Sequence, residues 1–280
     1  MMGETAVQRH DRMMREERDQ AERLRTDQGT PPDMWKGRTR TFAVTEGPEP
    51  PVVSILAGLV DANARVIDVG AGGGRITIPL ARRVREVIAV EPSAGMREEL
   101  KAGIEEMGIG NIRIVPSSWS DADVDPADMI FAAHVTYGVP RIEPFLRKLD
   151  ARATRVAALV SFEEPAQHVL APFWKAVYGE DRLRLPVRAE VVDVLRELGA
   201  DPQEIPVEVQ PVRSFGTPDE AFASLRGRLF IGEGTEAEQR LRDAIPALTV
   251  ERDGEVWPRE AAPNRQSVIW WRPGQMANPD

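Results

Sequence analysis

A glycine-rich segment preceded by an acidic residue carries the clearest chemical signal in this sequence. Residues 66–81 read VIDVGAGGGRITIPLA, so that an apolar run passes through Asp68 into Gly70, Gly72 and Gly74. Glycine has no Cβ, which lets a ligand approach the backbone closely and allows positive φ. In a doubly wound sheet such a turn lies at the carboxyl end of the first strand, where ligands bind. The segment therefore predicts a ligand-binding loop.

A second carboxylate follows the next apolar run, where residues 87–96 read VIAVEPSAGM and place Glu91 at the end of a strand. The two oxygens of a carboxylate can accept hydrogen bonds from both hydroxyls of a ribose. A dinucleotide would require G-x-G-x-x-G, but Arg75 occupies the third glycine position. That side chain would spoil the close packing of helix on strand. The spacing of Glu91 by itself leaves the identity of the nucleoside open.

The loop has the form G-x-G-x-G, and together with Asp68 and the segment EPSAGM it resembles the class I S-adenosylmethionine-dependent methyltransferases. The resemblance implies S-adenosyl-L-methionine as the cofactor. It places Glu91 on the ribose and Met96 near the adenine, although Met96 is equally well explained as an ordinary core residue. The cofactor-binding positions implied in these first two motifs are Asp68, Gly70, Ala71, Gly72, Gly74, Glu91, Pro92 and Met96.

The third apolar run leads into VPSSWSDAD, at residues 115–123. Related methyltransferases supply a polar residue here, often Asp, to the adenine amino group. The resemblance therefore implies Ser118 at the adenine edge and Trp119 near its face. Ser in place of Asp is a departure from the family pattern, and Trp119 is also consistent with a half-buried residue at the end of a strand.

The fourth apolar run ends at Ala133 and His134, at the position that faces the methyl group and the acceptor in this family. A neutral imidazole there can take a proton from an acceptor hydroxyl or amine. The alternative is that His134 contacts the cofactor or caps the following helix; Tyr137 is a second catalytic candidate. The N-P-P-Y signature of adenine and glutamine N-methylation is missing. No metal-ligand spacing is present, so we expect no metal.

Aromatic and basic residues outside the expected sheet are candidates for the acceptor site: Trp35, Arg38, Phe42, Trp174 and Tyr178. Aromatic rings at the mouth of a cleft bind flat or apolar ligands. The spacing of Trp174 and Tyr178 on one helix is equally that of a buried helix face.

Apolar runs that alternate with helical segments must position these residues. Strands are expected at 65–69, 86–91, 111–116, 128–133 and 155–162, with VEVQPV (207–212) and SVIWWRP (267–273) as later strands. Continuous apolar strands separated by helices indicate a parallel sheet covered on both faces. The resemblance implies an α/β, doubly wound, Rossmann-like, seven-stranded and mostly parallel sheet of order 3-2-1-4-5-7-6. Its last strand is antiparallel, and helical additions surround the sheet.

The chain divides into residues 1–50, an N-terminal helix and lid segment, and residues 51–280, a class I methyltransferase domain. Acceptor-site insertions are expected at about 163–187 and 217–264. The first 28 residues carry a thin apolar stripe of Val7, Met14 and Ala21. This helix either packs on its own domain or serves as an arm in a dimer.

The composition excludes several classes of function. The 280 residues include no cysteine, which removes disulfides, thiolate metal sites and a cysteine nucleophile. The net charge of −9, from 36 basic and 45 acidic residues, argues against a nucleic-acid partner bound by bulk positive charge. No apolar run is long enough to span a membrane, and the N-terminus lacks a signal peptide. We expect a cytoplasmic protein without a membrane partner, either a monomer or a homodimer.

These features favour a methyltransferase that acts on an oxygen or nitrogen atom of a small molecule. An RNA or protein methyltransferase is the first alternative, and a non-catalytic module that binds S-adenosylmethionine is the second. Arg75 argues against a nicotinamide-dependent oxidoreductase.

Overall fold

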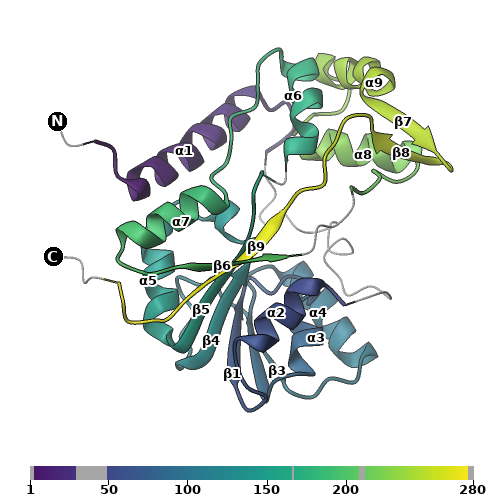
Figure 1. Ribbon diagram of the computed structural model, residues 1–280. Helices are drawn as coiled ribbons and strands as arrows, with labels where there is room; N and C mark the ends of the chain where they lie inside the picture. Colours follow the sequence, from purple (N-terminus) through teal and green to yellow (C-terminus); the bar gives the residue numbers. More distant parts are fainter. Residues whose placement is uncertain (1–2, 30–48, 166, 208–211, 277–280) are drawn as a thin grey trace.

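The computed structural model describes residues 3–29, 49–165, 167–207 and 212–276, and it contains a seven-stranded sheet flanked by helices (Figure 1). The strands are β1 (Arg65–Val69), β2 (Glu86–Val90), β3 (Ile112–Val115), β4 (Ala127–Ala133), β5 (Ala153–Phe162), β6 (Gln203–Val207) and β9 (Gln266–Trp271). Their order is β3-β2-β1-β4-β5-β9-β6. Because β9 is the seventh strand of this sheet along the chain, the expected order is confirmed.

Strand β9 is antiparallel to both of its neighbours, β5 and β6, whereas the other pairs in the sheet are parallel. The parallel strands therefore end at one edge, which we call the carboxyl edge. The antiparallel strand β9 begins at that edge, where Gln266 pairs with Phe162 of β5 and with Val207 of β6. The fold is the expected Rossmann-like methyltransferase architecture.

Helices cover both faces of the sheet because successive side chains of a buried strand point to opposite sides. Ile67 and Val69 pack on one face with residues of α5 (Ile142–Arg152) and α7 (Arg188–Glu197). Val66 packs on the other face with residues of α2 (Pro51–Gly58) and α3 (Thr77–Ala81). Helix α4 (Ala94–Glu106) adds a smaller apolar cluster. The turn that follows β1 extends to Ile76, and helix α3 begins at Thr77.

A second group of elements, which we call the cap, lies beyond the carboxyl edge (Figure 1). It comprises η3 (His168–Leu170), α6 (Ala171–Tyr178), α8 (Pro218–Arg228), α9 (Glu236–Leu248), β7 (Thr249–Arg252) and β8 (Glu255–Pro258). The cap has an apolar interior of its own, which includes Trp174, Leu225 and Leu241. Its elements come from the two segments in which the sequence suggested insertions.

The structure gives the elements of these later segments in detail. The insertion expected at about 217–264 contains two helices, α8 and α9, separated by a segment that contains Gly232 and Gly234. The hairpin of β7 and β8 was not expected, although Asp253 and Gly254 both have positive φ and the Asp-Gly pair favours such a turn. Strand β6 (Gln203–Val207) overlaps the strand expected at 207–212 at Val207, and residues 208–211 lie outside the described residues.

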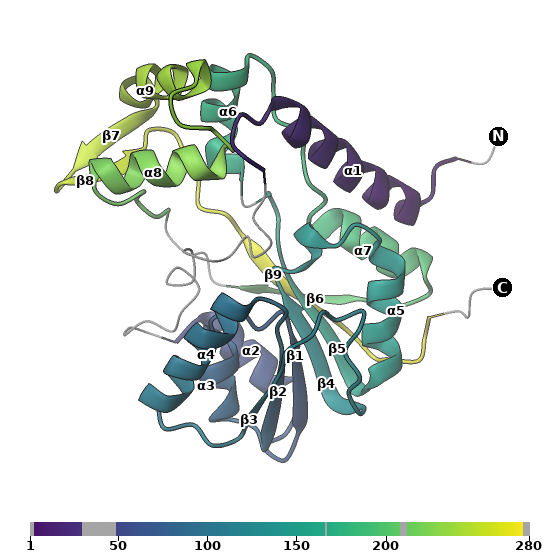
Figure 2. The ribbon, with the colours of Figure 1, turned by 180° about the vertical axis from the view of Figure 1, so that it is seen from behind.

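Helix α1 (Ala6–Leu24) packs on its own chain, against α7 and α5 and next to the cap (Figure 2). Its Glu17 pairs with Arg182 at 2.8 Å, and Asp11 accepts a hydrogen bond from the backbone N–H of Ile142 at 3.1 Å. This arrangement agrees with the first of the two interpretations of the N-terminal stripe. Within the described ranges, no helix is long and apolar enough to cross a membrane.

Candidate cofactor and acceptor site

Three of the four glycines in the loop after β1 have positive φ, but their surroundings differ. A Cβ on Gly70 (φ 76°) would lie 2.6 Å from Cγ2 of Val135, and a Cβ on Gly74 (φ 89°) would lie 2.6 Å from Cδ1 of Leu100. These two positions require glycine for packing as well as for conformation. A Cβ on Gly72 (φ 55°) would meet nothing within 4 Å. The backbone at Gly72 therefore faces open space that a ligand can occupy.

Glu91 holds this loop against the end of β2. Its side chain is buried, with Oε2 accepting from the Gly72 N–H and Oε1 from the Ser93 N–H, each at 2.8 Å. A carboxylate can accept about four hydrogen bonds. Its position beside the open backbone of Gly72 is compatible with a nucleoside whose ribose carries a vicinal diol.

Asp68 supplies a second buried carboxyl group next to the loop, and its Oδ2 accepts a hydrogen bond from the hydroxyl of Thr77 at 2.6 Å. Burial raises the pKa of Asp68 to about 7, the negative charge of Glu91 adds to this effect, and Thr77 opposes it. No described cation forms an ion pair with Asp68. Two buried acidic groups thus lie beside the loop, an arrangement that favours a positively charged ligand.

The residues expected around the adenine lie on β2–α4 and after β3. Met96 is buried in α4, whereas Pro92 is exposed. Trp119 is buried in the same apolar cluster as Val90, and the ammonium group of Lys148 lies 4.9 Å from the centre of its ring. Burial of Met96 and Trp119 is consistent with both interpretations of each residue.

The hydroxyl group of Ser118 is engaged in a local network. Its Oγ lies 2.6 Å from Oδ2 of Asp121 and 2.7 Å from the hydroxyl oxygen of Ser120. Asp121, three residues further on, therefore places a carboxylate beside Ser118.

At the exit of β4, His134 adopts φ 58°, which is unusual for a residue other than glycine. Its backbone N–H donates to the carbonyl of Val160 at 2.9 Å, and its imidazole stacks on the ring of Phe162 with centroids 4.2 Å apart. Ala133 precedes it as the last residue of β4. The left-handed turn thus holds the imidazole against the end of β5.

Tyr137 completes this aromatic cluster. Its hydroxyl oxygen accepts from the backbone N–H of Phe162 at 2.7 Å and lies 3.4 Å from Nδ1 of His134. Its ring is stacked relative to both His134 and Phe162, at centroid distances of 6.2 Å. The structure therefore brings together the two candidate catalytic residues, and the ring of Phe162 packs against both of them.

Neither His134 nor Tyr137 is a strong base at neutral pH. Burial, followed by the positive charge of Arg75, lowers the pKa of His134 to about 4, while Gln266 acts in the opposite direction. Burial raises the pKa of Tyr137 to about 12. At neutral pH the imidazole is uncharged and the phenol keeps its proton.

Of the residues expected to bind the acceptor, Trp174 and Tyr178 lie in the cap. Trp174 is fully buried, with the Arg182 guanidinium 4.5 Å from its ring centre and the Tyr178 ring 4.7 Å away. The Tyr178 hydroxyl donates to the carbonyl of Leu229 at 2.6 Å. These positions agree with the alternative that both residues form a buried helix face. Trp35, Arg38 and Phe42 lie outside the described residues.

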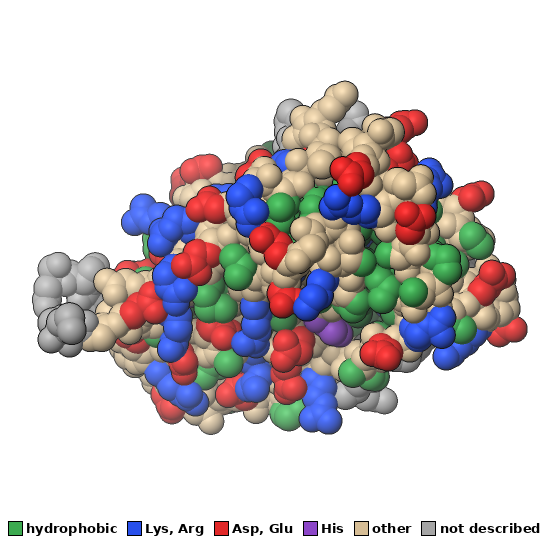
Figure 3. All heavy atoms as spheres, turned by 90° about the horizontal axis from the view of Figure 1, so that it is seen from above, with side chains coloured by type: hydrophobic (Ala, Val, Ile, Leu, Met, Phe, Trp, Pro, Cys, Tyr) green, Lys and Arg blue, Asp and Glu red, His purple; other side chains and the backbone are tan. Residues whose placement is uncertain are grey.

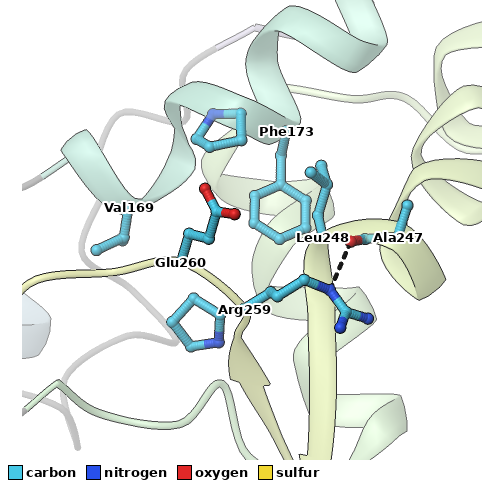
Figure 4. A pocket seen from close by; sticks show the side chains of 8 residues that line it. Val169, Phe173, Ala247, Leu248, Arg259 and Glu260 are labelled. Carbon is cyan, nitrogen blue, oxygen red and sulfur yellow. Dashed lines mark hydrogen bonds between the residues drawn. The ribbon is translucent and has the colours of Figure 1, made fainter.

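A pocket of about 130 Å³ lies within the cap (Figure 4). It is lined by Val169, Pro172, Phe173, Ala247, Leu248, Pro258, Arg259 and Glu260. Arg259 is already used, because its guanidinium donates to carbonyls at the end of α9, including that of Ala247 at 2.8 Å. Pockets for drug-sized ligands measure about 300–1,000 Å³. This small pocket contains none of the residues of the carboxyl edge described above.

Sequence reasoning missed several residues at the carboxyl edge. Phe162 was treated only as the end of a strand, and Arg75 only as a departure from a dinucleotide motif. Gln266 was not considered. An aromatic residue that ends an apolar strand of a parallel sheet lies at the ligand-binding edge, and this rule would have identified Phe162.

Comparison with known protein families agrees with this geometry. The family described as "Methyltransferase domain" matches residues 66–158, which extend from β1 into β5. A curated protein of Pyrobaculum aerophilum, named "Probable ribosomal RNA small subunit methyltransferase A", is 32% identical over 151 residues. The matched region covers 54% of this chain and 62% of that protein.

Solved structures show the same fold at low sequence identity. The YcgJ protein from Bacillus subtilis matches with a TM-score of 0.54 and 17% identity, over 79% of this chain and 97% of that one. The magnesium protoporphyrin IX methyltransferase from Synechocystis PCC 6803, solved with bound S-adenosylhomocysteine (SAH), matches with a TM-score of 0.50 and 14% identity, over 95% and 97%.

Residues 66–158 match a methyltransferase domain, and the sheet order and the glycine loop agree with the class I methyltransferase fold. The chain is an S-adenosylmethionine-dependent methyltransferase, and S-adenosyl-L-methionine is its cofactor.

Proposed function

We propose that this enzyme transfers the methyl group to an oxygen or nitrogen atom of a small molecule held between the carboxyl edge and the cap. The observation that carries the proposal is the cluster of His134, Tyr137 and Phe162. It lies at the exits of β4 and β5, on the edge that also holds Asp68 and Glu91. Aromatic walls with a few polar groups suit a compact acceptor.

The proposed cofactor site uses both buried carboxyl groups. Glu91 accepts the ribose hydroxyls, and Asp68 favours the positive charge of the cofactor. The remaining proposed contacts are the backbone of Gly70, Ala71, Gly72 and Gly74, the adenine neighbours Pro92, Met96, Ser118 and Trp119, and, near the methyl group, Ala133 and His134. The open space in front of Gly72 supports this placement.

The bound cofactor supplies a methyl group on a positively charged sulfur, so a lone pair of the acceptor bonds to the methyl carbon while the sulfur–methyl electron pair returns to sulfur. An acceptor that carries a proton releases it to water. Positioning contributes most to such a displacement. Because the pKa of His134 is about 4, we assign His134 and Tyr137 to orientation of the acceptor, with proton removal by His134 as the weaker alternative.

Two features support a small-molecule acceptor, namely the charge of the chain and the position of the cap over the carboxyl edge. The chain carries a net charge of −9, and the face seen from the cap side mixes acidic and basic side chains without a broad basic field among the described residues (Figure 3). The cap stands over the carboxyl edge. An RNA acceptor is the second candidate, favoured by the name of the Pyrobaculum aerophilum relative.

We also propose that residues 1–50, with the helix α1 and a lid segment, complete the acceptor site. Trp35, Arg38 and Phe42 remain predicted acceptor contacts in that segment. The ion pair between Glu17 of α1 and Arg182, which stacks on Trp174 of the cap, supports a link between these parts.

A labelled-methyl assay tests the proposal. The enzyme is incubated with S-adenosylmethionine labelled on the methyl group and with three fractions of a cell extract: metabolites below the cut-off of an ultrafilter, total RNA, and protein. Label is expected in the metabolite fraction and to be lost with His134→Ala. Label in RNA or protein alone would overturn the small-molecule assignment. Cofactor binding without transfer to any fraction would indicate a non-catalytic module.

A further inference from the structure

The hydroxyl group of Tyr137 is the meeting point of three polar contacts at the exits of β4 and β5. Its oxygen accepts a hydrogen bond from the Phe162 N–H at 2.7 Å, and it lies 3.3 Å from the hydroxyl oxygen of Ser161 and 3.4 Å from Nδ1 of His134. The directions of these hydrogen bonds determine which nitrogen of the imidazole carries a proton.

The hydrogen-bonding capacity of the phenol limits these directions. A hydroxyl group has one proton to donate and two lone pairs that accept, and the Phe162 N–H fills one lone pair of the Tyr137 oxygen. Ser161 is fully buried, and its hydroxyl lies closer to the Tyr137 oxygen (3.3 Å) than to the Phe162 carbonyl (3.5 Å). Because buried hydroxyl groups are hydrogen-bonded, Ser161 donates to Tyr137 and fills the second lone pair. The proton of Tyr137 is then left for Nδ1 of His134.

Both rings have the protonation states that this arrangement requires. Burial raises the pKa of Tyr137 to about 12, so the phenol keeps its proton at neutral pH. Burial lowers the pKa of His134 to about 4, so the imidazole is uncharged and carries a single proton. A neutral imidazole that accepts a hydrogen bond at Nδ1 has its proton on Nε2. The Nε2–H group of His134 is therefore a hydrogen-bond donor.

The surroundings of His134 agree with a proton on Nε2. Gln266 of β9 pairs with Phe162 of β5, and directly opposed residues of an antiparallel pair have their side chains on the same face. Because the imidazole stacks on the ring of Phe162, this register brings the Gln266 amide to the same place. The effect of Gln266 on the pKa of His134 is that of an amide oxygen that accepts from the ring. His134 remains partly exposed, so a ligand at the carboxyl edge can reach it.

We propose that Tyr137 is a positioning residue, which donates its proton to Nδ1 of His134 so that the Nε2–H group of His134 binds an oxygen atom of the acceptor. This inference rests on the proposed function and specifies an acceptor that presents a carboxylate, carbonyl or hydroxyl oxygen to His134, rather than an ammonium group. Tyr137 acts through His134 and does not itself touch the acceptor. Nε2 removes no proton from the acceptor, because it already carries one.

Magnetic resonance of the ring nitrogens tests the tautomer directly. The enzyme is labelled with ¹⁵N at its three histidines and saturated with SAH at pH 7, and His134→Asn identifies the resonances of His134. We expect the His134 proton on Nε2, with Nδ1 at the chemical shift of an unprotonated nitrogen that accepts a hydrogen bond. A proton on Nδ1 would overturn the inference, whatever molecule the enzyme methylates.

Tyr137→Phe removes the donor and keeps the ring. We expect the Nδ1 resonance of His134 to move toward that of a nitrogen without a hydrogen bond. In the labelled-methyl assay, the amount of small-molecule fraction that gives half-maximal rate should rise by about three- to tenfold, the effect of weakening one hydrogen bond. The affinity for S-adenosylmethionine should stay within about twofold of the wild-type value, because the cofactor keeps its proposed contacts.

Tyr178→Phe is the matched control, because Tyr178 is the second tyrosine of the chain and its hydroxyl donates to the Leu229 carbonyl in the cap at 2.6 Å. It should change neither the His134 resonances nor the response to the acceptor fraction. A weaker response in Tyr137→Phe without a shift of the His134 resonances would place Tyr137 against the acceptor and overturn the inference. Equal effects in both variants would also overturn it. If no small-molecule fraction accepts label from the wild-type enzyme, the proposed function fails, and the wild-type spectrum still decides the tautomer.

Discussion

The buried carboxyl group of Asp68 makes the stability of the free enzyme depend on pH. Its pKa rises from 3.8 in the unfolded chain to about 7 in the folded protein. Between these values the folded state holds a proton that the unfolded state has released. The free energy of unfolding therefore falls as pH rises from about 4 to 7.

Asp68→Asn removes this titration and keeps an oxygen that can accept from Thr77. We expect the variant to gain stability relative to wild type between pH 4.5 and pH 8, as measured by urea unfolding of the cofactor-free proteins, and to bind S-adenosylmethionine more weakly at pH 8. A stability difference that does not change with pH would show that Asp68 is ionised throughout this range.

The depressed pKa of His134 predicts a different pH behaviour. With a pKa near 4, the imidazole is neutral throughout the range from pH 5.5 to 8. We therefore expect that titration of His134 causes no rise or fall of kcat with pH in this range. We also expect His134→Asn, which tolerates φ 58°, to lower kcat much more than the affinity for S-adenosylmethionine. A limb near pH 6.5 that disappears in His134→Asn would instead indicate a proton-accepting histidine, and equal losses in kcat and cofactor affinity would indicate a cofactor contact.

At the scale of elements, substitutions in the glycine loop should affect either the packing of the loop or the binding of its ligand, depending on the position. Gly74→Ala places a methyl group 2.6 Å from Leu100 and 2.9 Å from Ile78, so we expect it to cost about 2–4 kcal/mol of stability, from overpacking and positive φ together. Gly72→Ala meets open space and should cost only about 1 kcal/mol.

Affinity for the cofactor should instead be more sensitive to Gly72→Ala, because the added methyl group points to where the cofactor is proposed to lie. Calorimetry with S-adenosylmethionine should show a large loss of affinity for this variant despite its near-normal thermal stability. Unaltered affinity in Gly72→Ala would place the cofactor elsewhere.

The contacts between α1 and the segment that follows α6 include one shielded ion pair. The side chains of Glu17 and Arg182 are only 11% and 7% exposed, whereas those of Asp193 and Arg9, which join α1 to α7, are 49% and 41% exposed. Removing one partner of a buried pair costs about 3–5 kcal/mol, and an exposed pair contributes less than about 1 kcal/mol. Glu17→Ala should therefore destabilise the protein far more than Asp193→Ala in urea unfolding. Similar losses in both variants would show that the pair with Arg182 is not effectively buried.

At the scale of the whole molecule, the acidic net charge predicts a weak salt dependence. Affinity for RNA through several phosphates falls by about 10³–10⁵ between 50 and 200 mM salt. For the small-molecule acceptor of the proposed function, we expect KM to rise by less than about tenfold over this range, because a small molecule makes few charge contacts that salt can screen. The comparison is made with the small-molecule fraction at fixed pH. A much steeper dependence would favour a polyanionic acceptor.

The sequence by itself determined the core of this protein. Continuous apolar strands can only be buried on both faces, so their alternation with helices predicted the parallel sheet, and the resemblance supplied its order. The glycine loop and Glu91 were visible because backbone conformation and strand ends are encoded within a few neighbouring residues. The turn at Asp253 and Gly254 is also encoded by neighbouring residues, so the hairpin of β7 and β8 could have been predicted from the sequence.

The tertiary structure alone decided what lies around the exit of β4. His134, Phe162 and Gln266 are separated by up to 132 residues in the chain, yet strand pairing places them at one edge. The burial of Trp174 and the low pKa of His134 each depend on neighbours that are distant in sequence. Burial and electrostatic environment are properties of assembled elements, and a local pattern of residues does not contain them.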